Sequence, residues 1–369
     1  MTFDKKNYDA LIIGGGIFGL YTANYLSSKG LKVALLEKEK ALLNKASKVN
    51  QARVHNGYHY PRSLETAKLT SCYYDRFCKD FNLALIKPFK QYYAISKENS
   101  RISVDDYIKF CKGLNLPLKE INSSLLFKKN KIAATFEVEE SCFNYVKIKD
   151  YFINKITNKV DIYYQSYPIS IDEVVSKYLL TLNIPTIKIS TPIVINATYS
   201  MVNEVNNLFS FSNYEIKYEL CELAIGTINS EFSNIGLTVI DGPFFSLIPY
   251  GENNKVSLSS VDFSPINTSY LRPQDKNNHI LKNAKNKLLE KHINWKKMER
   301  LAETYLKQNI NFTYNTSIFE IKPILTSSEE NDDRPTLITI HSRKPFFISV
   351  LSGKISTIYD LDQKLNTIF

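Results

Sequence analysis

Long apolar runs and paired cysteines are both missing from this sequence. No run of about 18 apolar residues occurs, so we expect no transmembrane helix. The five cysteines are scattered and form no C-x-x-C pair, which makes disulfides and metal sites unexpected. The first residues, MTFDKKNYD, are polar and lead directly into an apolar run, so we expect no signal peptide. Together these absences predict a globular protein of the reducing cytoplasm, without a metal site.

Glycine is also scarce, and its distribution is uneven. Only 12 of 369 residues are glycine, and four of them lie between positions 14 and 19. An apolar run, Asp9–Ile13, precedes them, helical apolar spacing follows over Ile17–Lys29, and a second apolar run covers Leu31–Leu36. This pattern predicts a strand–turn–helix–strand unit. Its turn carries a G-x-G-x-x-G sequence made by Gly14, Gly16 and Gly19.

Each part of this unit suits a dinucleotide. Gly14 allows the tight turn, Gly16 lets the backbone approach a pyrophosphate, and Gly19 lets the helix pack close to the strand. The free N–H groups and the dipole of the first helical turn favour phosphates. Glu37, 23 residues after Gly14, can accept hydrogen bonds from a ribose diol. We therefore predict a dinucleotide site, although an ordinary βαβ turn without a nucleotide can carry the same glycines.

Positive charge is in excess, with a formal net charge of +10 at pH 7. Part of it lies in a lysine-rich stretch, residues 276–307, whose apolar spacing predicts one or two amphipathic helices with basic outer faces. No nucleic-acid recognition motif accompanies this stretch, so we predict no nucleic-acid partner. Attraction to anionic substrates, or peripheral contact with a membrane surface, stays open.

A dense set of polar and aromatic side chains follows the second apolar run. Two of the five histidines fall within five residues there. Such side chains can cap a core, but beside a phosphate-binding loop they favour a functional role. The members of this set are Gln51, Arg53, His55, Asn56, Tyr58, His59, Tyr60 and Arg62.

Four segments of the chain resemble the D-amino-acid-oxidase-like superfamily of FAD-dependent oxidoreductases. LIIGGGIFGLYTANYLSSKGLKVALLEKEK matches its FAD fingerprint. ASKVNQARVHNGYHYPRSLETAK is similar to the L-2-hydroxyglutarate oxidase branch, whose H-x-G-x-Y-Y-type sequence appears here as His55, Gly57, His59 and Tyr60. PIVINATYS resembles the strand that ends in N-A-T/A-G, with Tyr199 where glycine is usual, and the final RP and SGKISTI look like the return of the chain to the flavin. DGPFFSLIPYG resembles a less characterised group within the superfamily.

The resemblance implies an α/β fold with two interleaved domains. A Rossmann-like FAD-binding domain is predicted to comprise residues 1–90, 141–205 and 316–369. An antiparallel-sheet (α+β) substrate domain is predicted to comprise residues 91–140 and 206–315, where alternating apolar residues indicate strands.

The resemblance also implies non-covalent FAD. The pyrophosphate would lie against Gly14, Gly16, Ile17, Phe18 and Gly19, with Glu37 at the adenosine ribose and Lys38 near the adenine. The pyrophosphate, the ribityl chain and the flavin edge would meet Ser47, Asn50, Gln51, Arg53 and Val54. At the C-terminal return, a helix N-terminus with a lysine would stabilise negative charge at the flavin N1–C2=O locus. The residues of this return are Ser352, Gly353, Lys354 and Ile355.

Substrate residues are implied less directly. Arg334, before Pro335, resembles the arginine that grips the substrate carboxylate in several amino-acid oxidases, and a guanidinium binds a carboxylate through two parallel hydrogen bonds. Pairing of Arg334 with Asp332 or Asp333 in a surface turn is the alternative. A histidine in the pocket could take a hydroxyl proton or keep an amine neutral, whereas a structural role stays open for each candidate. The candidates are His55, His59, Tyr60 and Tyr250.

The predicted function is that of an FAD-dependent oxidoreductase of the amino-acid-oxidase type. It would oxidise a C–N or C–O bond of a small amine or amino/hydroxy acid by hydride transfer to flavin N5. We expect the substrate to be anionic or carboxylate-bearing. A 2-hydroxy-acid dehydrogenase that uses an electron carrier and a non-catalytic FAD-binding protein are the alternatives. The sequence does not indicate the oligomeric state.

Overall fold

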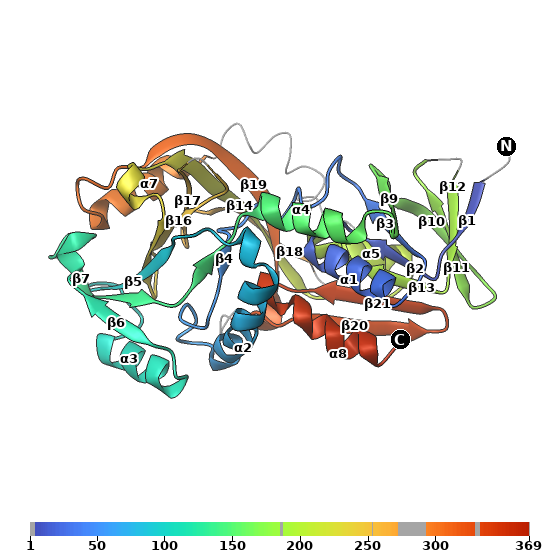
Figure 1. Cartoon of the computed structure of the whole chain (residues 1–369), viewed down its shortest axis with the longest axis horizontal. Helices are drawn as coiled ribbons and strands as arrows, with labels where there is room; N and C mark the ends of the chain where they lie inside the picture. Colours follow the sequence, from blue (N-terminus) through green and yellow to red (C-terminus); the bar gives the residue numbers. More distant parts are fainter. Residues whose placement is uncertain (1–3, 185–186, 253, 272–292, 329–332, 369) are drawn as a thin grey trace.

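The computed structural model describes residues 4–184, 187–252, 254–271, 293–328 and 333–368. The molecule is elongated, and each half is built around one large β-sheet (Figure 1). Both chain ends lie in the same half, on the right of the view, and helices α2 and α4 lie near the middle. No helix in the described residues is long and apolar enough to cross a membrane.

The first half contains a six-stranded sheet that begins with the predicted glycine-rich unit. β2, α1 (Ile17–Ser28) and β3 form this unit, which confirms the predicted strand, helix and second strand. Five strands are parallel, and only β20, at the edge, runs antiparallel to its neighbour. In spatial order the strands are β20 (Leu337–Arg343), β21 (Phe346–Leu351), β13 (Ile193–Asn196), β2 (Ala10–Ile13), β3 (Val33–Glu37) and β9 (Val160–Tyr164).

Strand β2 shows why the chain folds this way locally. All four of its residues are apolar and buried, as expected for a parallel strand that is covered on both faces. Ala10 and Ile12 pack in one hydrophobic cluster with α1 and α4 (Tyr145–Ile156). Leu11 and Ile13 pack in a second cluster on the opposite face, towards α5 (Val202–Leu208).

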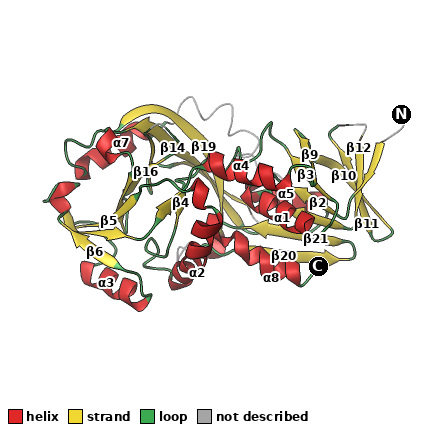
Figure 2. Cartoon of the chain, viewed as in Figure 1, coloured by secondary structure: helices red, strands yellow, loops and turns green. Residues whose placement is uncertain are grey.

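The C-terminal segment closes over α1 and α2 (Leu64–Asp80). The 3₁₀ turn η6 (Ile355–Tyr359) leads into α8 (Asp360–Asn366), which lies beside α2 in Figure 2. Tyrosine–aspartate hydrogen bonds and an ion pair tie these helices together, and we name this set the C-terminal clamp. Its contacts are Tyr21 to Asp362 (2.7 Å), Tyr73 to Asp360 (2.6 Å), Tyr359 to Asp80 (2.9 Å) and Arg76 to Asp362 (2.7 Å).

The second half contains a nine-stranded, largely antiparallel sheet. Its longest strands are β14 and β19, which pair along their whole length. In spatial order the strands are β18 (Pro265–Leu271), β14 (Ile216–Thr227), β17 (Lys255–Ser260), β16 (Phe245–Pro249), β15 (Ile235–Ile240), β5 (Lys90–Ser96), β7 (Ile132–Val138) and β6 (Leu118–Ile121), with β19 (Thr313–Leu325) beside β14. Helices α3 (Val104–Gly113) and α7 (Trp295–Tyr305) accompany this sheet.

The order of the strands along the chain alternates between the two sheets, as the predicted fold class requires. The predicted domain boundaries stay a prediction, and the boundary between residues 315 and 316 falls inside β19. Within the predicted lysine-rich stretch, residues 276–292 lie outside the described residues, and α7 forms the remainder.

Two smaller sheets complete the fold. One is four-stranded, in the order β1 (Asp4–Asn7), β12 (Ile187–Thr191), β11 (Lys177–Leu182) and β10 (Pro168–Val174). The other pairs β4 (Arg53–Val54) with β8 (Ser141–Cys142) and so joins the polar segment after β3 to the end of β7. Six 3₁₀ turns lie in the described residues: η1 (Asn82–Ala84), η2 (Ser123–Leu125), η3 (Tyr199–Met201), η4 (Ser230–Phe232), η5 (Thr326–Ser328) and η6.

The hairpin between β10 and β11 turns through residues that do not suit its backbone. Val175 and Ser176 have φ of 45° and 61°, as in a type I′ turn, which favours Asn-Gly. Because Val175 is 91% exposed, we expect the double variant V175N/S176G to raise the free energy of unfolding by about 1–2 kcal/mol, measured by urea denaturation. The control is Val261→Asn, also exposed, which should change stability by less than about 0.5 kcal/mol. A double variant no more stable than the wild type would contradict the argument.

Candidate functional site

The glycine-rich turn forms a cradle at the N-terminus of α1. A Cβ on Gly19 would lie 1.9 Å from the Gly14 carbonyl oxygen, so this position must be glycine for the helix to approach the strand. A Cβ on Gly16 would meet only the Ser47 Oγ, at 3.4 Å. In this part of the described chain, α1 has no side-chain cap and no acidic residue in its first turn. The cradle therefore leaves the positive end of the helix dipole to an anion.

Glu37 closes this cradle from the end of β3. Its Oε2 accepts a hydrogen bond from the Gly15 N–H at 2.8 Å, and its Oε1 accepts one from the Glu39 N–H at 2.7 Å. Each carboxylate oxygen keeps a further lone pair for an additional donor. Burial raises the pKa of Glu37, and the two backbone donors oppose this effect. Lys38 extends past the strand end, with its ammonium 5.5 Å from the ring centre of Tyr167.

The loop between β3 and β4 is held mainly by its own side chains. Ser47 Oγ accepts the Ile17 N–H at 3.1 Å, which ties the loop to the first turn of α1. Asn50 donates to the carbonyl oxygens of Ala46 and Ser47 and accepts the Ala52 N–H at 2.6 Å. The amide of Asn50 therefore shapes the loop, whereas its predicted contact with a cofactor stays a prediction.

The polar segment after this loop brings His55, His59 and Tyr60 together. The two imidazole rings are stacked, with centroids 5.1 Å apart and planes 24° from parallel. The Tyr60 ring stands edge-on to both histidines, at 5.2 Å and 5.3 Å. Three of the four predicted substrate-pocket candidates thus form one cluster, which we name the histidine cluster.

A buried chain of hydrogen bonds lies against the histidine cluster. Arg53 donates from Nη1 to the Tyr93 hydroxyl at 2.8 Å and from Nη2 to Thr238 Oγ1 at 3.1 Å and to Gln51 Oε1 at 3.4 Å. Tyr93 in turn donates to Glu140 Oε2 at 2.7 Å. Glu140 Oε1 also accepts the backbone N–H of Asn56 at 3.0 Å. The Tyr93 hydroxyl thus links the buried guanidinium of Arg53 to the buried carboxylate of Glu140. These hydrogen bonds offset part of the free-energy cost of burying both charges.

The predicted C-terminal return also reaches this cluster. Lys354 Nζ contacts the Tyr60 hydroxyl and lies 4.4 Å from the centre of its ring. Burial, and then the positive charge of Arg53, lower the pKa of Lys354 from 10.5 to about 7. Ser352 Oγ accepts the Lys354 N–H at 3.3 Å and bonds Thr357 at 2.8 Å, which shapes the start of η6 at Ile355.

Arg334 lies beside the return. Its Cδ is 3.6 Å from where a Cβ on Gly353 would stand, and its charge contributes to lowering the pKa of His59. Arg334 Nη1 donates to the carbonyl oxygen of Asp333 at 2.8 Å, whereas the Asp333 carboxylate accepts a hydrogen bond from Ser63 at 2.5 Å. The alternative partner Asp332 lies outside the described residues.

Tyr250 lies apart from the histidine cluster. Its hydroxyl donates to the Lys48 carbonyl oxygen at 3.0 Å, and its ring packs on Tyr145 at 5.6 Å. It borders the loop between β3 and β4 instead. Sequence reasoning missed Tyr93, Thr238 and Glu140, all buried and all bonded to the predicted residues.

Electrostatics favour neutral histidines here. Burial, followed by the charges of Lys354 and Arg53, lowers the pKa of His55 well below 6.5. Burial, followed by Arg53, His55, Lys354 and Arg334, lowers the pKa of His59 well below 6.5. Burial raises the pKa of Glu140, with Arg53, Tyr93 and the Asn56 N–H opposing it.

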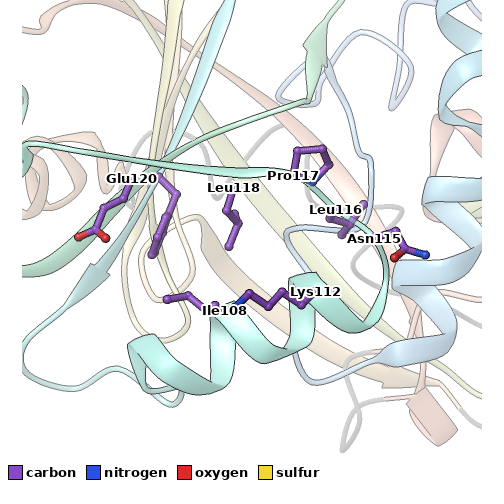
Figure 3. A pocket seen from close by; sticks show the side chains of 8 residues that line it. Ile108, Lys112, Asn115, Leu116, Pro117, Leu118 and Glu120 are labelled. Carbon is purple, nitrogen blue, oxygen red and sulfur yellow. The ribbon is translucent and has the colours of Figure 1, made fainter.

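A separate surface groove of about 540 Å³ lies between α3 and β6. Figure 3 shows Ile108 and Lys112 on the helix facing Leu118 and Glu120 on the strand. None of the predicted site residues, all of them described, lines this groove. The described residues also contain no group of three or more His, Cys, Asp or Glu side chains placed to hold a metal ion.

Residues 9–176 match the family model described as "DAO: FAD dependent oxidoreductase". Over these residues the sequence is similar to the DAO family of FAD-dependent oxidoreductases. The match spans the glycine cradle, the histidine cluster and Glu140.

Known proteins are similar to this chain in sequence over a part of its length and in fold over nearly all of it. L-2-hydroxyglutarate dehydrogenase of Indibacter alkaliphilus is 34% identical over 97 residues, which are 25% of this chain and 24% of that protein. Glycine oxidase from Geobacillus kaustophilus superposes with a TM-score of 0.73 at 10% identity, covering 95% of this chain and 90% of that one. L-alpha-glycerophosphate oxidase from Mycoplasma pneumoniae with FAD bound gives a TM-score of 0.73 at 17% identity, covering 98% and 94%. The chain thus aligns with about a quarter of the length of the first curated relatives, and with nearly all of these two folds.

The residues of this chain fit FAD at the cradle. The remaining N–H groups of the first helical turn, the open position at Gly16 and the carboxylate of Glu37 provide what a pyrophosphate and a ribose require. Tyr199, which stands where glycine is usual in the family, has a φ of 56°. The chain therefore keeps the left-handed backbone that glycine would adopt without cost.

Proposed function

We propose that the chain is an FAD-dependent oxidoreductase that oxidises a C–N or C–O bond next to a carboxylate in a small molecule. The observation that carries this proposal is the gathering of Arg53, Lys354 and Arg334 around two neutral histidines. The two guanidinium groups, and Lys354 when it is protonated, favour an anionic substrate, and they favour negative charge that develops on the cofactor. FAD, when bound, would supply the two-electron acceptor.

The roles of the chain's own residues follow from their geometry. The guanidinium of Arg334 suits a carboxylate, which would orient the carbon to be oxidised. Lys354 would hold positive charge at the flavin N1–C2=O side. A neutral histidine can take the proton of a hydroxyl or keep an amine unprotonated. The cofactor would be held without a covalent bond, and the protein would act in the cytoplasm.

A dehydrogenase of 2-hydroxy acids that passes electrons to a carrier is the second candidate. The neutral His55 beside a buried carboxylate favours it, because a hydroxyl group must lose a proton when it is oxidised. The sequence similarity to L-2-hydroxyglutarate dehydrogenase supports this candidate, and the fold similarity to glycine oxidase supports oxidation of an amine.

The visible absorption spectrum of the purified protein tests the proposal. We expect flavin bands that remain in the supernatant after denaturation, which a non-covalent cofactor requires. The bands should bleach anaerobically with one of two panels, 2-amino acids or 2-hydroxy acids, and the panel that bleaches them identifies the bond. A colourless protein that also fails to take up added FAD would contradict the proposal and favour a non-catalytic role. Bands that stay with the pellet would instead mean a covalent flavin.

A further inference from the structure

The two stacked histidines face partners of opposite kinds. Nδ1 of His55 lies 3.4 Å from Glu140 Oε1. Nδ1 of His59 lies 3.3 Å from Arg53 Nη1. A neutral imidazole carries its single proton on one nitrogen and a lone pair on the other, and the partner at Nδ1 decides which.

Arg53 can only donate hydrogen bonds. Its Nη1 directs one N–H at the Tyr93 hydroxyl and faces Nδ1 of His59 with the other. Nδ1 of His59 must therefore accept, which places the His59 proton on Nε2.

Glu140 is held as an acceptor on both oxygens. Because the Tyr93 hydroxyl accepts from Arg53, its own hydrogen points to Glu140 Oε2. The Asn56 N–H points to Oε1. These two donors and the positive charge of Arg53 favour the ionised form of Glu140. Its Oε1 then accepts from Nδ1–H of His55, and Nε2 of His55 keeps its lone pair.

We propose that Glu140 and Arg53 hold His55 and His59 in opposite tautomers, so that His55 presents a proton acceptor at Nε2 and His59 presents a proton donor at Nε2. This inference rests on the proposed function for its chemical use, but not for its geometry. Glu140 and Arg53 act through the histidines and are positioning residues.

His55 and His59 would have different roles in the oxidation of an alcohol. The hydroxyl proton of the substrate would pass to Nε2 of His55 as the C=O bond forms. FAD, when bound, would supply the two-electron acceptor for the hydrogen that leaves the carbon with its electron pair. His55 then carries two protons and one positive charge, which the carboxylate of Glu140 stabilises. His59 donates from Nε2 to an oxygen of the substrate, such as a neighbouring carboxylate. The substrate class that uses both rings is therefore an alcohol with an acceptor oxygen beside it.

The charges around the two rings are not the same. Arg53 and Lys354 oppose a positive charge on either ring, and Arg334 adds to this effect at His59. Glu140 is the acid that contacts His55 among the described residues. A positive charge formed on His55 would therefore lie beside the Glu140 carboxylate.

The tautomers can be measured directly by NMR of protein labelled with ¹⁵N-histidine, in which two-bond couplings separate Nδ1–H from Nε2–H. The variants His55→Asn and His59→Asn assign the two signals. At pH 8 we expect Nδ1–H for His55 and Nε2–H for His59. Two rings in the same tautomer, or a proton on Nε2 of His55, would overturn the proposal.

Variants of Glu140 test its role in positioning His55. In Glu140→Gln we expect His55 to lose its Nδ1–H preference while His59 keeps Nε2–H, and kcat to fall about 100-fold with little change in KM. Glu140→Asp should restore part of both readouts. The matched control Glu139→Gln, at an exposed neighbouring acid, should alter neither.

An unchanged His55 tautomer in Glu140→Gln would remove Glu140 from the proposal. A protein without flavin would contradict the proposed function and leave the tautomer result standing, whereas bleaching by 2-amino acids alone would contradict only the alcohol assignment.

Discussion

Replacing Gly19 by alanine should abolish FAD binding and lower the free energy of unfolding by more than about 3 kcal/mol. The added Cβ would stand 1.9 Å from the Gly14 carbonyl oxygen, and 3.4 Å from a side-chain methyl of Ile12. No rotamer relieves this clash, because the obstructing atom belongs to the backbone. Helix α1 would have to move away from β2, and its N-terminus would leave the phosphate position. Urea denaturation and titration with FAD, followed by flavin fluorescence, measure both losses.

Two other glycines provide the comparison. Gly113→Ala, at the end of α3 with no atom within 4 Å of the new Cβ, should stabilise by up to about 1 kcal/mol and leave FAD binding intact. Gly16→Ala meets only Ser47 Oγ at 3.4 Å, so the fold should remain while the cradle is partly filled. We expect stability close to that of the wild type with FAD affinity at least about tenfold weaker. Full FAD affinity in both Gly16→Ala and Gly19→Ala would rule out the cradle as the pyrophosphate site.

Replacing Lys354 by methionine should make the flavin-free protein more stable at pH 6 by several kcal/mol. The folded protein holds this amine with a pKa of about 7, against 10.5 ordinarily. Between these values the unfolded chain binds the extra proton, so stability rises with pH from 7 to about 10.5 and is lowest below 7. Methionine removes this cost, at about 1.4 kcal/mol per pKa unit. Urea denaturation at pH 6 and pH 9 should show the advantage of the variant shrinking as the pH rises.

Under the proposed function, the same variant should reduce the rate of flavin reduction by about 100-fold, because it removes the positive charge that Lys354 would place at the flavin N1–C2=O side. The groups that face Lys354 are Arg53, His55, His59 and Tyr60, and all four remain in the variant. Lys364→Met, at an exposed position of α8, serves as the control and should show neither effect. If Lys354→Met and the wild type keep parallel stability curves from pH 6 to pH 9, the amine is not desolvated and the argument fails.

Local features of the chain could be predicted from its sequence because their causes are local. The unit from β2 to β3 depends on apolar residues and glycines within about thirty positions, and its bounds agree with the prediction to within two residues. His55, His59 and Tyr60 could be grouped because they are nearly consecutive. The fold class followed from resemblance, and the alternation between the two sheets confirms it.

The partners of these residues could not be predicted, because they arrive from distant strands. Glu140 lies 85 residues beyond His55 and comes to it through the pairing of β4 with β8. Tyr93 and Thr238 lie on β5 and β15, neighbouring strands in a sheet whose order the sequence pattern does not indicate. Glu140 lies between β7 and β8, outside both strands, and its sequence neighbours Glu137 and Glu139 gave no sign that this one acid is buried. The role of Tyr250 stays a prediction, and the structure places its hydroxyl on the loop between β3 and β4.

The position of β21 has a consequence for how the protein is made. This strand, completed only at Leu351, lies beside β13 inside the sheet that β2 and β3 begin, and the C-terminal clamp follows it. At about 5–20 residues per second, a ribosome needs on the order of ten seconds or more to cover the roughly 150 residues between Asn196 and Phe346. During that interval the apolar edge of β13 has no partner strand on that side. Newly made chains are therefore exposed to aggregation until the last strand emerges, and their yield should depend on chaperones and on slow, cool expression.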